Sequence, residues 1–275
     1  MLHPAKKRMR SRRNRKPNKS RRPWRANLES LEARLVLSGD FGYVLGIGGV
    51  GNDRASDVAT DASGNVYITG QYQGTVDFDP SPTGVTTLVS KGTTDVRPGA
   101  DDVFVAKYSP TGSLIWVNSM GGAGYDVVSG IAVDAAGGVV VVGNFSGTAS
   151  FGAGTNQTNL TSISASDIFV AKFQGNGTLQ WAERIGGPLL SGIGTARDVA
   201  VDASGNIHIV GDFSGTVDFD PSDAAANRTP LGSSSSTDVF ALKLNSLGGF
   251  NWVATFGSSN NSDLGRGIAV DGDGN

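Results

Sequence analysis

Carboxylates that recur at a fixed place in the sequence are the residues best suited to chemistry. Each stands in an Asp-x-x-Gly pattern whose oxygens could gather around a metal ion, and Asp271-Gly-Asp-Gly-Asn275 resembles the start of a calcium loop. The same pattern suits a hairpin turn, because Asp accepts hydrogen bonds from its own backbone and Gly adopts positive φ. These loops lack the Glu that an EF-hand needs at its twelfth position. We therefore predict structural turns at Asp61, Asp134, Asp202 and Asp271.

Two pairs of carboxylates stand two residues apart, Asp77 with Asp79 and Asp218 with Asp220. Alternate residues of a strand project to one face, so each pair needs a cation, water or a sugar hydroxyl between its charges. We favour a charged outer strand, ended by a proline, that resists edge pairing, and we therefore predict no cofactor. Calcium bound by these pairs is the alternative. The chain consists of repeats, described below, and the second of them (123–187) lacks these carboxylates. A calcium site is therefore not expected in every repeat.

A Lys follows an Asp by five positions three times, but residues five apart on a strand lie on opposite faces and cannot pair within it. We expect these charges to contact a turn or a neighbouring unit; they are Asp102/Lys107, Asp167/Lys172 and Asp238/Lys243. A tryptophan follows each Lys after a Gly-containing turn. We predict packing roles for Trp116, Trp181 and Trp252, with a sugar-stacking surface as the alternative.

Catalytic arrangements are hard to find in this sequence. Apart from His3, the one imidazole is that of His208. The other repeats have Tyr67 and Val140 at the equivalent position, which indicates that His208 packs in the core. Every carboxylate that could serve a glycosidase recurs as a repeat element, and none forms a unique pair. The Gly-rich run Gly46–Gly49 lacks the Lys and following helix of a phosphate loop. We predict no catalytic residues and no enzymatic activity.

Composition favours an all-β fold. Gly contributes 40 of the 275 residues and charged residues only 17%, while β-branched and aromatic residues fill short apolar runs, as expected for strands joined by tight turns. The chain has no Cys, which excludes disulfides and thiolate metal sites. None of its apolar runs approaches the ~20 residues of a transmembrane helix.

The elements that position these residues repeat along the chain with a period of about 65 to 73 residues. Each copy has an Asp-Val-Ala-type strand before the turn, a strand after it, a Gly-Thr-Val-Asp-Phe-Asp-Pro type segment, a strand of the Asp-Val-Phe-Val-Ala-Lys type and a strand through the Trp. Four antiparallel strands per repeat are typical of a β-propeller blade, whose faces are covered by its neighbours. A β-solenoid of stacked units is the alternative.

Over residues 41–275 these blocks resemble the β-propeller repeat family of bacterial surface and secreted proteins, whose units run IAVDxxGNxYxTG, GTVDFDP and DxFVAKxxxxGxxxW. The resemblance implies a noncatalytic extracellular or cell-surface scaffold or binding module with a protein or glycan ligand. A polysaccharide-binding or polysaccharide-acting propeller is the alternative.

The ends of the repeated region are offset from the blade boundaries. Phe41–Gly49 aligns with Leu114–Gly122, with Tyr43 in the place of a Trp, so the region opens on the last strand of a blade and stops inside a first strand. Three blades fall short of the usual four to eight, so we expect a fragment that needs further repeats or further copies to close its ring. The predicted divisions are a lone closing strand (41–49), three repeats (50–122, 123–187 and 188–258) and a truncated fourth (259–275).

The N-terminal residues differ from the remainder in charge. Residues 1–25 contain 12 of the 23 Lys and Arg and no acidic residue, so we predict a disordered basic arm over 1–27. Residues 28–39, with the sequence LESLEARLVLSG, predict a short helix and resemble an export segment of planctomycete surface and secreted proteins. That resemblance implies export. Binding of nucleic acid or an anionic surface through the arm is the third functional prediction.

Overall fold

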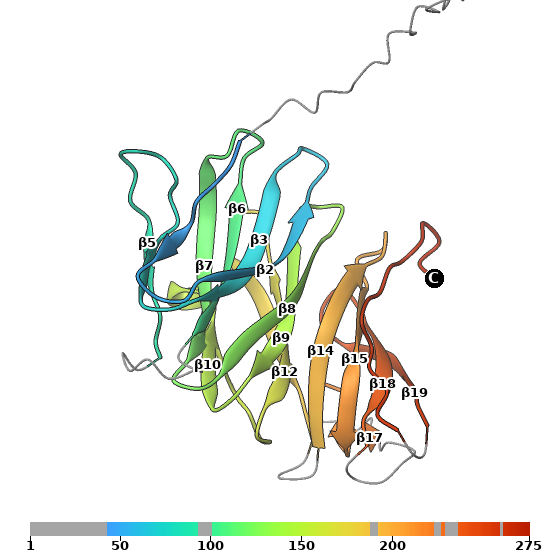
Figure 1. Cartoon of the computed structure of the whole chain (residues 1–275). Coiled ribbons are helices and arrows are strands. Elements are labelled where there is room, and N and C mark those ends of the chain that lie inside the picture. Colours follow the sequence, from blue (N-terminus) through green and yellow to red (C-terminus); the bar gives the residue numbers. More distant parts are fainter. Residues whose placement is uncertain (1–42, 93–100, 188–191, 223–226, 229–235, 259–260) are drawn as a thin grey trace, which may run out of the picture. The chain divides into compact units, whose positions relative to one another are not determined.

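The computed structural model describes residues 43–92, 101–187, 192–222, 227–228, 236–258 and 261–275, and these form antiparallel strands (Figure 1). The predicted arm (1–27) and short helix (28–39) lie outside the described residues. Within the described ranges, no helix has the length and apolar character to cross a membrane. The short 3₁₀ turn η1 (Gly154–Asn156) interrupts the strands in the second repeat. The all-β prediction is confirmed.

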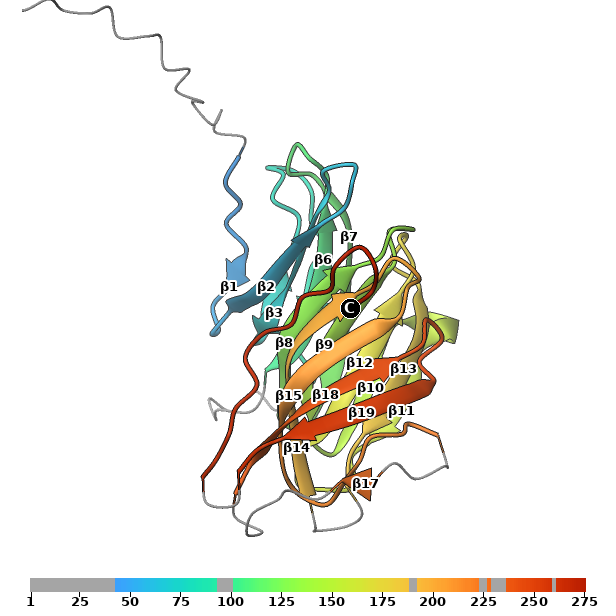
Figure 2. The same ribbon diagram turned by 90° about the vertical axis from the view of Figure 1, so that its right-hand side faces the viewer.

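Three antiparallel sheets each contain four consecutive blade strands (Figures 1 and 2). The first blade consists of β2 (Arg54–Thr60), β3 (Val66–Tyr72), β6 (Asp102–Tyr108) and β7 (Leu114–Gly122). The second consists of β8 (Asp126–Val133), β9 (Val139–Phe145), β12 (Asp167–Phe173) and β13 (Leu179–Ile185). The third consists of β14 (Gly192–Val201), β15 (Ile207–Gly215), β18 (Asp238–Leu244) and β19 (Phe250–Phe256). The fold is an incomplete β-propeller, as predicted.

Burial explains why the central strands are apolar on both faces. Every residue of β6, β9 and β12 is buried. Neighbouring blades cover both faces of the sheet that contains β9 and β12, whereas one face of β6 packs near Leu45 and Ile47, which precede the first blade. Alternate valines of β9 face opposite neighbours: Val139 and Val141 pack in the first seam, between blades one and two, whereas Val140 and Val142 pack in the second seam, between blades two and three. The short valine run of the sequence therefore forms the middle of the core.

Each repeat also contributes a short hairpin between its second and third blade strands. These hairpins are β4 (Thr75–Asp77) with β5 (Thr87–Val89), β10 (Thr148–Phe151) with β11 (Thr158–Thr161), and β16 (Val217–Asp218) with β17 (Asn227–Arg228). β10 pairs with β7, the last strand of the preceding blade, and β4 pairs in the same way with β1 (Gly48–Gly49). Asp218 forms a bridge to Gly186. The first two hairpins lie at sheet edges, with β5 and β11 outermost, but β4 and β10 are each paired on both sides. The expectation of a charged outer strand is therefore wrong for Asp77, which pairs with both Gly48 and Thr87.

The segments before the first blade and after the third continue the blade pattern. Tyr43 lies over Gly112 as Trp116 lies over Gly177 in the first seam. At the other end, the N–H of Ile268 donates to Asp198 Oδ2 at 2.9 Å, as the N–H of Ile131 donates to Asp57 at 2.9 Å. Residues 264–275 therefore contact the third blade as the first strand of a following blade would.

Candidate functional site

The recurrent Asp of each repeat lies in the turn after the first strand of its blade. Asp61 Oδ1 accepts the N–H groups of Ser63 and Asn65, both at 3.0 Å, and Oδ2 accepts the Asn65 amide at 2.7 Å. Gly64 has a φ of 78°, which a residue with a side chain rarely adopts. Equivalent turn contacts are made by Asp134, Asp202 and Asp271. These carboxylates are therefore held by the turns in which the sequence analysis placed them.

A lysine from the third strand of each blade reaches the same turn carboxylate. Lys107 Nζ lies 3.5 Å from Asp61 Oδ2 and 4.8 Å from the ring centroid of Tyr67. The corresponding distances are 3.0 Å for Lys172 and Asp134, and 3.1 Å for Lys243 and Asp202. All six side chains are largely buried. The expectation that these lysines contact a turn is confirmed. The partner carboxylate was not predicted, because the contact depends on the register that sets Tyr67 opposite Lys107.

These contacts keep the turn carboxylates ionised. Burial opposes the charge on Asp61, but hydrogen bonds from the side chain and backbone of Asn65 and from the Tyr67 hydroxyl outweigh it and lower its pKa to about 2. Asp202 behaves alike: hydrogen bonds from Asn206, His208 and Lys243 overcome the effect of burial and lower its pKa. A carboxylate with so low a pKa is a weak proton acceptor, which makes either residue a poor general base near neutral pH.

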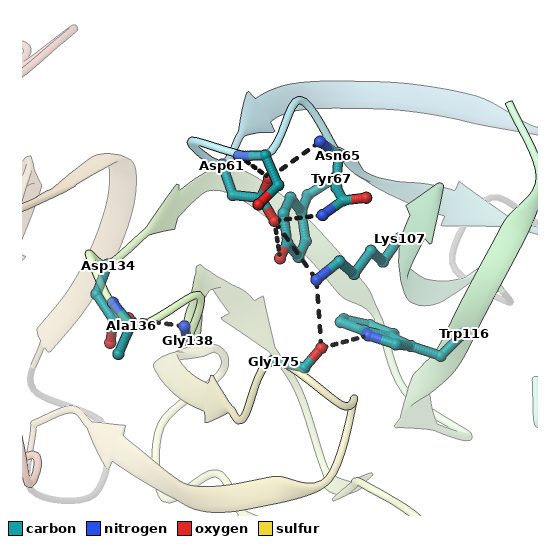
Figure 3. A network of polar contacts seen from close by, with 10 residues as sticks. Asp61, Asn65, Tyr67, Lys107, Trp116, Asp134, Ala136, Gly138 and Gly175 are labelled. Atoms are coloured by element: carbon teal, nitrogen blue, oxygen red, sulfur yellow. Dashed lines mark hydrogen bonds and ion pairs between the residues drawn. The ribbon is translucent and has the colours of Figure 1, made fainter. Parts of the chain in front are cut away.

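A polar groove of about 420 Å³ separates the turns of the first two blades (Figure 3). Asp61 and Lys107 stand on one side, and the turn of Asp134 stands on the other. Between them, the carbonyl oxygen of Gly175 accepts hydrogen bonds from Lys107 Nζ at 3.4 Å and from Trp116 Nε1 at 3.0 Å. The groove offers carboxylate, ammonium and backbone groups to a polar ligand, although most of these groups are already paired within the protein.

The predicted packing tryptophans lie at the boundaries between blades. A Cβ on Gly177, whose φ is 87°, would be only 2.8 Å from Trp116 Cδ2, so the ring rests directly on this turn of the next blade. Trp181 lies on Gly248 in the same way. Trp252 has no such glycine among the described residues and is 45% exposed. Trp116 and Trp181 thus pack between blades, whereas Trp252 packs edge to face on His208 of its own blade and leaves much of its side chain open.

The calcium candidates lie at the ends of the short hairpins. Asp77 Oδ1 accepts the N–H groups of Asp79 and Thr86, at 3.0 and 2.9 Å. Asp218 accepts the N–H of Asp220 at 3.1 Å, and Asp220 in turn accepts from Ser222. Among the described residues, no group of three or more His, Cys, Asp or Glu side chains is arranged to hold a metal ion. Calcium binding by these pairs stays the alternative hypothesis.

His208 occupies a packing position in the third blade. Its side chain is 7% exposed, its Nε2 lies 3.2 Å from Asp202 Oδ2, and its ring meets Trp252 edge to face. Asp202 already receives the turn amides and Lys243, so this His and Asp belong to a structural network.

A recurrent aromatic group that the sequence did not predict lies on one face of each blade. In the second blade Phe145, Phe151 and Phe169 pack together, with ring centroids 5.9 and 5.1 Å apart. The first and third blades repeat this group with Tyr72, Phe78 and Phe104 and with Phe213, Phe219 and Phe240. The recurring Phe of the hairpin segment was the available signal.

Comparison with known proteins supports the repeat architecture. No family model matches the chain. The chain is 29% identical over 237 residues to a protein of Acanthamoeba polyphaga mimivirus described as uncharacterized WD repeat-containing protein L264. The match covers 78% of this chain and 16% of that protein. WD repeats are propeller blades, so the similarity agrees with the fold.

Proposed function

We propose that the chain is a noncatalytic β-propeller scaffold, exported to the cell surface or beyond, whose open blade faces bind further blades of the same type. The observation that carries this proposal is the exposure of the third blade. Phe256 is 55% exposed, whereas the residues at the equivalent position of the two preceding blades, Met120 and Ile185, are each 1% exposed in a seam. A further blade would bury Phe256 and Trp252 as the existing seams bury their counterparts.

The opposite face of the first blade has the complementary shape. It contains a hollow of about 180 Å³ whose lining includes Leu45, Ile47, Ile68, Tyr72, Phe78 and Phe104. In the first seam the corresponding aromatic group of the second blade packs with Val103, Val105 and Met120. The hollow therefore lies where side chains of a preceding blade would fit. One face projects side chains and the other receives them, as expected of successive blades.

Self-association of the full chain tests this proposal. Open apolar faces should make the chain associate as its concentration rises through the micromolar range, and Phe256→Ser should weaken that association. Leu247→Ser is the matched control, because Leu247 is 72% exposed but lies on a turn. Sedimentation velocity would show the difference. A chain that stays monomeric over this range, or equal loss from both variants, would count against the proposal.

A second candidate function is glycan binding. A hollow of about 220 Å³ beside the first seam is lined by an aromatic ring together with amide and hydroxyl groups, which suits a sugar ring; these residues include Trp116, Asn118, Asn156, Asn176 and Thr178. A glycan array probed with and without calcium would test this candidate and the alternative calcium site together. Asn176→Ala should abolish a specific signal, and Asn159→Ala, an exposed amide outside the hollow, should retain it.

A further inference from the structure

Two buried carboxyl groups meet in the first seam. Asp102 begins β6 and Asp126 begins β8, and the two residues are 0% and 2% exposed. Gly121 lies between them: a Cβ there would be 2.8 Å from Asp102 Oδ1 and 2.9 Å from Asp126 Oδ2. Both carboxyl groups therefore border the space that a side chain at position 121 would occupy.

Among the described residues, each carboxyl group has one oxygen that accepts hydrogen bonds and one buried oxygen without a partner. Asp102 Oδ2 accepts the N–H of Lys91 at 3.1 Å and the hydroxyl of Ser119 at 3.3 Å, and Asp126 Oδ2 accepts the N–H of Gly122 at 2.8 Å. Within the described part of the chain, Asp102 Oδ1 and Asp126 Oδ1 are buried and accept no hydrogen bond. A buried acceptor left unpaired is costly, and a proton on one carboxyl group would lower that cost.

The charges around the pair do not balance if both carboxyl groups ionise. The ammonium of Lys91 donates to the carbonyl oxygen of Gly121 and to Ser150. The Tyr72 hydroxyl shares a hydrogen bond with Ser119, and neighbouring Asp101 adds negative charge. Asp53 and Arg54 act on Asp101, with opposite signs. Among the residues that the structure describes, one ammonium faces two carboxyl groups, so ionisation of both would leave one surplus negative charge in a buried site.

The second seam shows how a balanced site differs. Asp167 occupies the position of Asp102 there, and Arg184 Nη1 lies 3.1 Å from its Oδ2. The position equivalent to Asp126 holds Gly194, which removes the second carboxyl group. The surplus charge is therefore peculiar to the first seam and does not follow from the blade pattern.

We propose that Asp102 and Asp126 form a proton-binding site that ties the packing of the first two blades to pH. One proton is held by the pair just below neutral pH, and its loss as the pH rises through neutrality leaves two carboxylates that repel each other inside the seam. Burial is the main cause: it raises the pKa of Asp102 to about 6 and that of Asp126 to about 7, and the charge on Asp102 raises the latter further. The two groups titrate as a coupled pair.

The direction of the pH dependence follows from these raised pKa values. Between the unfolded value of 3.8 and the folded values near 6 and 7, the folded chain binds more protons than the unfolded chain. The free energy of unfolding therefore falls as pH rises through this window and levels off above it. The stabilising contribution of the pair is present in acid and lost near pH 7.

Infrared spectroscopy and thermal unfolding of the full chain test the proposal. We expect a protonated carboxyl band that disappears between about pH 6 and pH 8, and a melting temperature that falls by about 5 °C over the same range. Asp126→Asn keeps an acceptor for Gly122 but removes the carboxyl group with the higher pKa, so both changes should end near pH 6, where Asp102 titrates alone. Asp167→Asn is the matched control: it should lower the melting temperature at every pH and keep the wild-type pH dependence.

Three results would overturn the proposal. If all carboxyl groups of the full chain titrate below about pH 5, the pair holds no proton near neutrality. If Asp126→Asn retains the wild-type slope of melting temperature against pH, another group causes it. Should Asp126→Asn fail to fold, Asp102→Asn is the second variant: it lacks one of the two titrating groups, and a carboxyl band of wild-type intensity in acid would refute the assignment.

Discussion

At the scale of single residues, the carboxylates that suggested a metal site stabilise turns. The turn of Asp61 could be predicted because its hydrogen bonds join residues no more than four positions apart. The contact with Lys107 could not, because it crosses the sheet between β3 and β6. Local hydrogen bonding can thus be predicted from residue types and spacing, whereas partners across a sheet require the register of the strands.

Removing the charge of Asp61 tests the contribution of its ion pair. Asp61→Asn keeps acceptors for the turn but leaves the largely buried ammonium of Lys107 without its counter-charge, so we expect a loss of about 1–3 kcal/mol in the free energy of unfolding. Asp271→Asn is the control, since its turn has the same backbone hydrogen bonds and no Lys pairs with it among the described residues. Urea unfolding would measure both, and equal losses would contradict a role for the pair.

The same carboxylates predict how the protein responds to acid. The pKa of Asp61 is lowered to about 2 and that of Asp202 is lowered as well, so the unfolded chain takes up protons at a pH where the folded chain does not. Their stabilising effect is complete above the ordinary value of 3.8 and should be lost as pH falls from about 4 to about 2. Melting temperatures in this range should fall steeply. A flat profile would show that these carboxylates titrate normally.

At the scale of elements, blades are joined by contacts between residues far apart in the sequence. Four strands per repeat could be predicted from the alternation of apolar runs and turns. The pairing of β10 with β7 could not, because it links the hairpin of one repeat to the last strand of another. The Gly-containing turn before each Trp was visible in the sequence, but the Trp that rests on it comes from the preceding blade.

A substitution at Gly177 tests this contact between blades. Gly177→Ala should cost about 1 kcal/mol for its positive φ and a further 1–3 kcal/mol because its Cβ would press against Trp116. Gly147→Ala separates the two effects, since Gly147 also has positive φ, 68°, but no atom lies within 4 Å of an added Cβ. Denaturant unfolding followed by tryptophan fluorescence would compare them. Equal losses in the free energy of unfolding would mean that the packing of Trp116 does not require a glycine at position 177.

At the scale of the whole molecule, the described blades form a directional array. The repeat period alone could predict blades but not their direction or their exposed faces, which depend on which side chains project beyond the last strand. Trp252 and Phe256 project from the third blade, and residues 264–275 already lie against it. The match to a WD repeat-containing protein covers only 16% of that protein. Partner binding by this chain is therefore a proposal.

The most direct test of the account is hydrogen exchange of residues 264–270 in a chain extended after Asn275 by a copy of residues 139–187. Asn275 occupies the turn position of Gly138, so the added residues supply the remaining three strands of a fourth blade. We expect the amides of 264–270 to exchange at least about 10-fold more slowly in the extended chain, because the new second strand would pair with them. Unchanged exchange rates would contradict the claim that the third blade presents a docking face for another blade.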